Sequence, residues 1–216
     1  GGKLHGMNSS GYAPQLISVE ALAERGITEM PSEGFLSVTV PGAPSGWAAL
    51  AKKFGRLPLT ETLAPAIRYA EEGFPVSPIV AKYWQSEIAY YRQKDWGEVL
   101  QPFFDTFTNA QGKAPVAGEY WCCPDQAKTL RLIAQTDGEA FYRGELAEKI
   151  DAFSRKHNAF IRKEDLAGFH TDWVDPIHIN YRGYDVWEIP PNGQGLVTLM
   201  ALNTLNGMDV APRGSV

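Results

Sequence analysis

The chain has 216 residues, 44% of them hydrophobic and 21% charged, so it holds enough apolar material for one substantial core. The 10 Phe, 9 Tyr and 6 Trp residues exclude disorder as its main state. The formal net charge is −5, the basic residues are scattered and no apolar run is long enough to span a membrane, so neither nucleic acid nor a bilayer is an expected partner.

Apolar residues at helical spacing dominate the first half of the chain. This spacing predicts helices at 14–26, 44–54, 60–73 and 77–93. Short strands are expected at 4–8 and 35–40. Trp47, Leu50 and Phe54 share one face of the helix at 44–54. Thr60 is the expected N-cap of the following helix and Gly73 its stop.

The second half is expected to contain helices at 125–136 and 139–157, separated by Asp137 and Gly138. Alternating apolar residues predict a β-hairpin at 174–189 that turns near Arg182 and Gly183. An apolar helix is expected at 195–205. With no internal repeat and no low-complexity linker, the sequence predicts one mostly helical α+β unit over 1–216.

The side chains indicate no self-contained active site. Cys122 and Cys123 are neighbours, so a disulfide between them would be strained, and ordinary packing is favoured over a soft-metal site. No Gly-x-Ser-x-Gly elbow supports a serine hydrolase. No histidine has the i, i+4 companion of a helix-borne metal pair: His5, His157, His170 and His178. No metal or cofactor is expected.

Two glycine-rich turns allow alternative interpretations. The turn at 193–195 leads into a helix and could hold an anion or a substrate, but a tight turn with close packing is favoured. The turn at 40–47 is likewise interpreted as a packing turn rather than a pocket. Carboxylates such as Glu145, four residues before Lys149, fit solvated helix faces better than acid/base pairs.

Several segments in a fixed order resemble the γ-glutamyltranspeptidase family, which includes cephalosporin (glutaryl) acylases. The resemblance covers about 190 residues, so it is specific although each segment alone is weak. The segments are VTVPGAPSGW at 38–47, FGRLPL at 54–59, LAPAIRYAEEGFPV at 63–76, FYRG at 141–144, EKI at 148–150, KEDL at 163–166, YRGY at 181–184 and PPNGQG at 190–195.

The resemblance implies an N-terminal-nucleophile hydrolase fold, an αββα sandwich from a precursor that cleaves itself into a large and a small subunit. The chain resembles the middle of the large subunit, without the strands expected before it or the small subunit. In the family the nucleophile is the new N-terminal Thr of the small subunit, whose own α-amino group acts as base. The resemblance therefore implies a small-subunit partner and no catalytic residue in this chain.

The resemblance also implies a substrate-binding stretch. In the family an Arg in an Arg-Glu-x-Ala-Pro stretch binds the α-carboxylate of the γ-glutamyl group. Aligning Ala13 and Pro14 with that stretch puts Ser10 at the Arg position, and a hydroxyl cannot form a bidentate carboxylate clamp. Ser10 and Tyr12 are thus the expected substrate-binding residues, and the departure favours the acylase-like branches over strict γ-glutamyl specificity.

The expected function is hydrolysis or transfer of γ-glutamyl or related acyl amides by the assembled enzyme. A non-catalytic interaction module that keeps the fold remains an alternative, and a freestanding helical binding domain is disfavoured. The sequence begins GGKLHG, without an initiator Met or signal core, and is expected to be a mature or truncated polypeptide. Cytoplasmic and exported locations both stay open.

Overall fold

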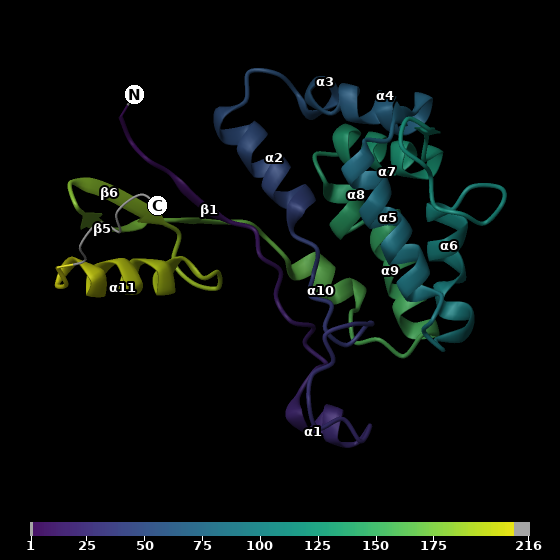
Figure 1. Cartoon of the computed structure of the whole chain (residues 1–216), viewed down its shortest axis with the longest axis horizontal. Coiled ribbons are helices and arrows are strands. Elements are labelled where there is room, and N and C mark those ends of the chain that lie inside the picture. The colour runs from purple at the N-terminus through teal and green to yellow at the C-terminus, as the bar shows by residue number, and fades with distance from the viewer. Residues whose placement is uncertain (1, 210–216) are drawn as a thin grey trace, which may run out of the picture.

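The computed structural model describes residues 2–209, and helices make up most of its regular structure (Figure 1). The α-helices are α1 (Val19–Ala23), α2 (Ala43–Phe54), α3 (Leu59–Thr62), α4 (Ala64–Glu72), α5 (Pro78–Tyr91), α6 (Gln101–Phe107), α7 (Pro124–Gln135), α8 (Glu139–Tyr142), α9 (Glu145–Lys156), α10 (Lys163–Gly168) and α11 (Gly195–Asn206), with a 3-10 helix η1 at Gly97–Leu100. The predicted mostly helical α+β class is confirmed.

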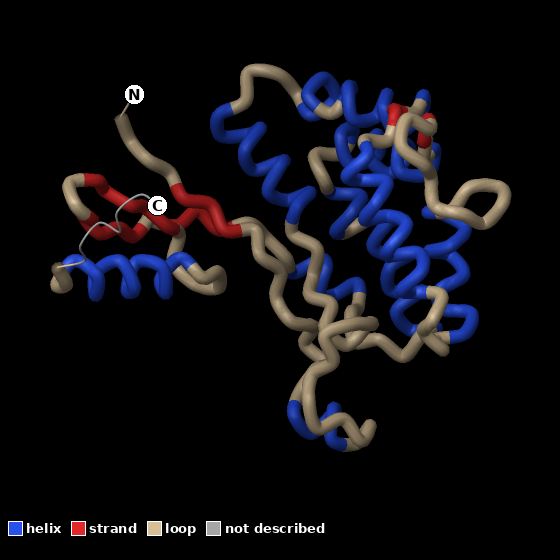
Figure 2. The backbone as a smooth tube through the Cα atoms, viewed as in Figure 1, coloured by secondary structure: helices blue, strands red, loops and turns tan. Residues whose placement is uncertain are grey.

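The strands form three antiparallel pairs, β1–β4, β2–β3 and β5–β6. Their bounds are β1 (Gly6–Asn8), β2 (Phe74–Pro75), β3 (Tyr120–Trp121), β4 (Asp172–Val174), β5 (Ile177–Tyr181) and β6 (Tyr184–Glu188). The predicted hairpin is confirmed: Arg182 and Gly183 have φ of 51° and 89°, the left-handed pair of a type I′ turn. Figure 2 shows the hairpin and α11 beside one another, apart from the main helical body.

Two buried clusters form the core of the helical body. The first lies among α8, α9 and α10 and contains Val40, Tyr142, Ala147, Ile161, Leu166 and Phe169. The second lies among α3, α4 and α7 and contains Leu59, Ile67, Ala127, Leu130 and Ala134. The Tyr12 ring packs on Phe169, with 5.4 Å between centroids. The first cluster therefore supports the segment that carries the expected substrate-binding residues.

The strand predicted at 35–40 is wrong. Gly34 has a φ of 89° and Pro41 ends the run, so this stretch is interrupted at both ends. Phe35 instead packs against Phe153, with ring centroids 5.7 Å apart. The buried Val40 donates its backbone N–H to the carbonyl of Tyr12 at 3.0 Å instead of joining a strand.

Two predicted helices are each divided. Thr60 lies inside α3 rather than capping a long helix, because Pro65 lacks the N–H that would continue it and α4 starts anew at Ala64. The stretch 139–157 is split into α8 and α9 at Gly144, whose backbone is extended. Gly73 ends α4 with a φ of 90°, as predicted.

The helix predicted at 14–26 is shorter than expected: α1 covers only Val19–Ala23, and Ser18 caps it by accepting the N–H of Ala21. Two other helix ends agree with the predicted ranges. Ser77 caps α5 by accepting the N–H of Val80, and α2 ends at Gly55. The elements η1, α6 and the β2–β3 pair were not predicted from the sequence. Helix α6 is held by aromatic packing, such as Phe103 on Tyr91 at 5.0 Å between centroids, rather than by a helical apolar pattern. Within residues 2–209, every helix is too short or too polar to cross a membrane.

Candidate functional site

The β1–β4 ladder divides its side chains between two sides. Trp173, the partner of Met7, contacts α2: Lys53 Nζ lies 3.5 Å from its ring centroid, and the Phe54 ring packs against it at nearly a right angle. Asn8, the partner of Asp172, is the next residue along the strand and belongs to the opposite side of the ladder. Asn8 is the last residue of β1, and residues 9–15 follow it directly.

A short amide relay fixes the start of residues 9–15, the segment that carries the expected substrate-binding residues Ser10 and Tyr12. The Asn8 side chain accepts the N–H of Ser10 at 2.9 Å and donates to the side-chain oxygen of Asn192 at 2.8 Å. Asn192 lies in the turn before α11, so two parts of the chain 184 residues apart meet here. The Ser10 and Tyr12 side chains are exposed.

The segment can lie this close to its support because two glycines lack a side chain. A Cβ on Gly11 would be 1.6 Å from the carbonyl oxygen of Val40, and one on Gly42 would be 1.8 Å from that of Ser9. At both positions a side chain would overlap sterically with a backbone oxygen, so only glycine fits. The turn at 40–47 is therefore a packing turn, as interpreted from the sequence.

Side-chain hydroxyl groups also bind the turn at 40–47. Ser9 Oγ and Ser45 Oγ lie 2.8 Å and 2.7 Å from Thr171 Oγ1. The buried Tyr142 hydroxyl donates to the carbonyl of Pro41 at 2.7 Å and accepts the N–H of Ser45 at 3.1 Å. Burial raises the pKa of Tyr142, so its phenol is a neutral donor at ordinary pH.

The charge beside the segment is acidic. Tyr12 Oη donates to Asp172 Oδ2 at 3.3 Å, and His170 Nε2 lies 3.2 Å from Asp172 Oδ1. Partial burial, followed by the Asp172 carboxylate, raises the pKa of Tyr12. Within residues 2–209, no hydrogen bond or ion pair joins Ser10 or Tyr12 to an Arg or Lys. The charged or chargeable groups that contact this surface are Asp172 and His170.

The other sequence candidates have ordinary packing roles. His5, His157 and His178 each pack against an aromatic ring, at 5.0 Å from Phe54, 4.4 Å from Phe153 and 4.0 Å from Trp187. In the turn at 193–195, a Cβ on Gly195 would be 2.7 Å from the side chain of Glu188, which fits the close-packing interpretation. Carboxylates on helix surfaces pair with neighbouring bases, including Glu71–Arg131, Glu139–Arg143, Glu145–Lys149 and Glu148–Lys163.

The described side chains hold no evident catalytic pair or metal site. Among residues 2–209, no hydrogen bond joins a Ser, Thr or Cys side chain to a histidine, and no group of three or more His, Cys, Asp or Glu side chains could hold a metal ion. Cys122 and Cys123 are free thiols. What this part of the chain offers is therefore a neutral, hydrogen-bonding surface with an acidic neighbour.

Ser10 and Tyr12 come from the sequence analysis, whereas Asn8, Asp172 and Asn192 were not singled out. The signals were present but indirect. Asn8 lies in the stretch aligned through Ala13 and Pro14, and Asn192 lies in the segment PPNGQG, but only the fold brings the two together.

The comparisons with known proteins agree with this architecture. The sequence model described as gamma-glutamyltranspeptidase matches residues 1–215. The chain belongs to the γ-glutamyltranspeptidase family. It is 36% identical over 203 residues, 94% of its length, to the glutathione hydrolase-like YwrD proenzyme of Bacillus subtilis, and spans 37% of that relative.

Solved structures of the family share the fold. The chain superposes on cephalosporin acylase from Bacillus halodurans with a TM-score of 0.95 and 53% identity, over 99% of this chain and 40% of that one. Helicobacter pylori gamma-glutamyltranspeptidase gives a TM-score of 0.86 at 25% identity, over 98% of this chain and 60% of that one. The chain therefore has the fold of part of an N-terminal-nucleophile hydrolase, as the resemblance implied, and the relatives it matches are longer than it is.

Proposed function

We propose that this chain is the middle part of the large subunit of an enzyme that hydrolyses or transfers acyl amides. The nucleophile is the N-terminal Thr of a small subunit released from the same precursor. Family membership supports the reaction class, and the proenzyme label of the Bacillus subtilis relative supports a precursor. The absence of a nucleophile–base pair within residues 2–209 fits a nucleophile supplied from elsewhere.

The surface around Ser10 carries the proposal for the acyl group. Ser10 aligns with a carboxylate-binding Arg, and its surroundings offer amides and hydroxyls beside the Asp172 carboxylate. An acyl group that depends on a charge clamp is poorly served by this surface. Because γ-glutamyl and glutaryl groups carry the same carboxylate, a surface without that clamp does not select the γ-glutamyl group, and the substrates include amides with glutaryl and other acyl groups. The 53% identity with a cephalosporin acylase supports the same branch.

The test assembles the complete precursor and measures hydrolysis of γ-glutamyl, glutaryl and butyryl anilides. We expect self-cleavage that exposes a new N-terminal Thr, turnover only by the assembled protein, and no more than modest discrimination between γ-glutamyl and glutaryl amides. The 216-residue chain alone is expected to be inactive. Turnover by that chain alone would contradict the assignment of the nucleophile to another subunit.

Two further outcomes are informative. A strong preference for the γ-glutamyl over the glutaryl anilide would show that the α-amino group, which alone distinguishes the two, is recognised, and the expectation of modest discrimination would be wrong. A strong preference for both over the butyryl anilide would show that a cation outside Ser10 binds the substrate carboxylate, and the role of Ser10 would be wrong. A folded precursor without an N-terminal Thr and without turnover would instead favour the alternative of a non-catalytic interaction module.

A further inference from the structure

We propose that Asp165 is a positioning residue that holds the substrate-binding segment in place. This inference rests on the proposed function of that segment. Asp165 Oδ1 accepts the backbone N–H of Gln15 at 2.9 Å, while Oδ2 accepts the N–H of Arg162 at 2.8 Å. The residue is 7% exposed, so one nearly buried carboxylate joins α10 to a segment 150 residues earlier in the chain.

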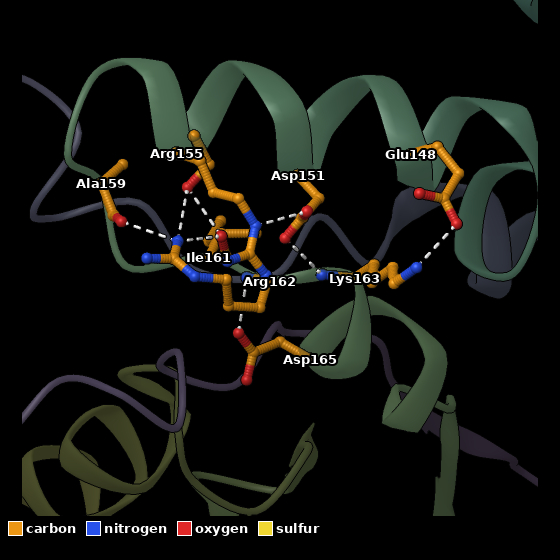
Figure 3. Close-up of polar contacts among 9 residues, drawn as sticks. Glu148, Asp151, Arg155, Ala159, Ile161, Arg162, Lys163 and Asp165 are labelled. Carbon is orange, nitrogen blue, oxygen red and sulfur yellow. Dashed lines mark hydrogen bonds and ion pairs between the residues drawn. The ribbon is translucent and has the colours of Figure 1, made fainter.

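Asp165 is itself firmly held. Its partner Arg162 directs the guanidinium to the carbonyl oxygens of Ile161 and Ala159, at 2.7 Å and 2.8 Å (Figure 3). The N–H of Lys163 donates to Asp151 Oδ1 at 3.2 Å. These bonds tie the first turn of α10 to α9 and to the loop between them. A carboxylate fixed in this way can position whatever it binds.

The binding surface lies between two such anchors. On one side, Ser9 is joined to Thr171 through their hydroxyls. On the other side, Gln15 is held by Asp165. Ser10 and Tyr12, whose side chains are exposed, lie between them. Loss of the Asp165 contact frees one end of the segment and leaves the Ser9 anchor and the buried core in place.

The hydrogen bond between Gln15 and Asp165 can be broken by a substitution at either residue. Asp165→Asn leaves one acceptor oxygen for two N–H donors. Gln15→Pro removes the donor itself, and because the Ile17 N–H bonds to the Pro14 carbonyl at 3.1 Å, Gln15 occupies the second position of a β-turn, which favours Pro. The second variant keeps the Asp165 side chain, but its ring Cδ takes the place of the amide hydrogen and pushes the segment away from Oδ1. It therefore breaks the contact even if Asp165→Asn folds poorly.

Two variants serve as controls. Asp151→Asn removes another carboxylate of 7% exposure, which accepts N–H groups of Arg155 and Lys163 and does not touch the substrate-binding segment. It measures the effect of loosening α10 from α9 while the Asp165–Gln15 contact is kept, and should raise KM less than Asp165→Asn. Gln15→Ala trims the exposed side chain and keeps the backbone donor.

Steady-state kinetics of the assembled enzyme with its best anilide, and amide hydrogen exchange across residues 9–17, provide the readouts. Asp165→Asn and Gln15→Pro are each expected to raise KM about tenfold and to change kcat less than about twofold, because a loosened wall weakens binding before it affects the chemical step. Both should speed exchange in residues 9–17. The double variant should add little to either single one.

Equal KM values and equal exchange for the Asp165 and Asp151 variants would overturn the inference, as would normal KM and exchange in Gln15→Pro. A fall in kcat alone would also contradict a role in positioning substrate. Failure of the proposed function gives a different result: the wild-type assembled protein turns over none of the anilides, and hydrogen exchange still decides whether Asp165 holds the segment.

Discussion

A Cβ atom on Gly42 would lie 1.8 Å from the backbone oxygen of Ser9 and 2.8 Å from the Phe169 ring. The start of α2 and the proposed substrate-binding segment at residues 9–15 are thus in backbone contact, with no room for a side chain between them. This contact explains why a glycine stands in the segment VPGAPSGW, which otherwise would read as a flexible loop. It also makes the site sensitive to the smallest possible substitution.

Gly42→Ala is therefore expected to destabilise the assembled protein by about 3 kcal/mol, since the methyl group must displace backbone rather than a flexible side chain. Urea unfolding measures the change. Gly168→Ala is the control, because no heavy atom lies within 4 Å of its Cβ position and its φ is ordinary; its effect should stay within about 0.5 kcal/mol. Equal stability of the two variants would show that Ser9 and Gly42 are not in contact.

Local rules predicted the elements whose ends are set by nearby residues. Ser77 caps α5, and the left-handed pair Arg182 and Gly183 closes the hairpin. One failure was also local: Pro65, inside the predicted helix at 60–73, starts a new helix where the apolar spacing suggests a continuous one. The other came from a distant residue, because Val40 bonds to Tyr12 instead of joining a strand.

The residues of the candidate site also fall into those that the sequence indicates and those that only the fold brings together. Ser10 and Tyr12 follow from a motif, because the family pattern places them within a few residues of Pro14. Asn192 and Asp172 could not be inferred, since they reach the segment from 184 and 160 residues away. Side-chain contacts over such separations depend on the packed fold, and no periodicity in one sequence encodes them.

Ser10→Arg tests the charge of the binding surface. The Arg would add a guanidinium to this surface, so the kcat/KM for γ-glutamyl and glutaryl anilides should rise relative to the uncharged butyryl anilide by about ten- to a hundredfold. Ser10→Gln, which adds length without charge, is the control and should change the ratio little. An unchanged ratio in the Arg variant would mean that residue 10 does not face the acyl group.

The buried carboxylate of Asp151 predicts a pH dependence of stability. Its hydrogen bond to Arg155 Nε, at 2.7 Å, lowers the pKa of Asp151 in the folded protein, although burial opposes the shift. A lowered folded-state pKa stabilises the protein above the unfolded-state value and loses that effect as the pH falls through the folded-state value.

Asp151→Asn should therefore lower the free energy of unfolding at pH 7 by about 1–3 kcal/mol, and the difference from wild type should shrink below about pH 4. Denaturant titrations of the assembled protein at several pH values measure this difference. The exposed Glu148 pairs with Lys163, so Glu148→Gln should cost less than about 1 kcal/mol at any pH. A deficit in Asp151→Asn that grows toward acid would contradict the assigned sign.

The last prediction concerns the apolar surface of the hairpin and α11. Val197 and Met200 of α11 are 58% and 61% exposed, and Trp187 of β6 is 45% exposed. Covering such side chains stabilises a fold by about 1.5–3 kcal/mol each, against a typical net stability of about 5–15 kcal/mol. The β5–β6 pair has no third strand within residues 2–209, so its outer backbone groups also lack partners there.

We therefore expect the 216-residue chain alone to bind a hydrophobic dye or to aggregate, and to resist proteolysis only as part of the proposed precursor. Replacing Val197 and Met200 with Ser should reduce dye binding by the isolated chain, whereas Lys156→Ser, on the polar end of α9, should not. A sharp, cooperative melt of the monomeric chain with slow amide exchange through β5 and β6 would contradict the prediction and would support a domain that folds independently.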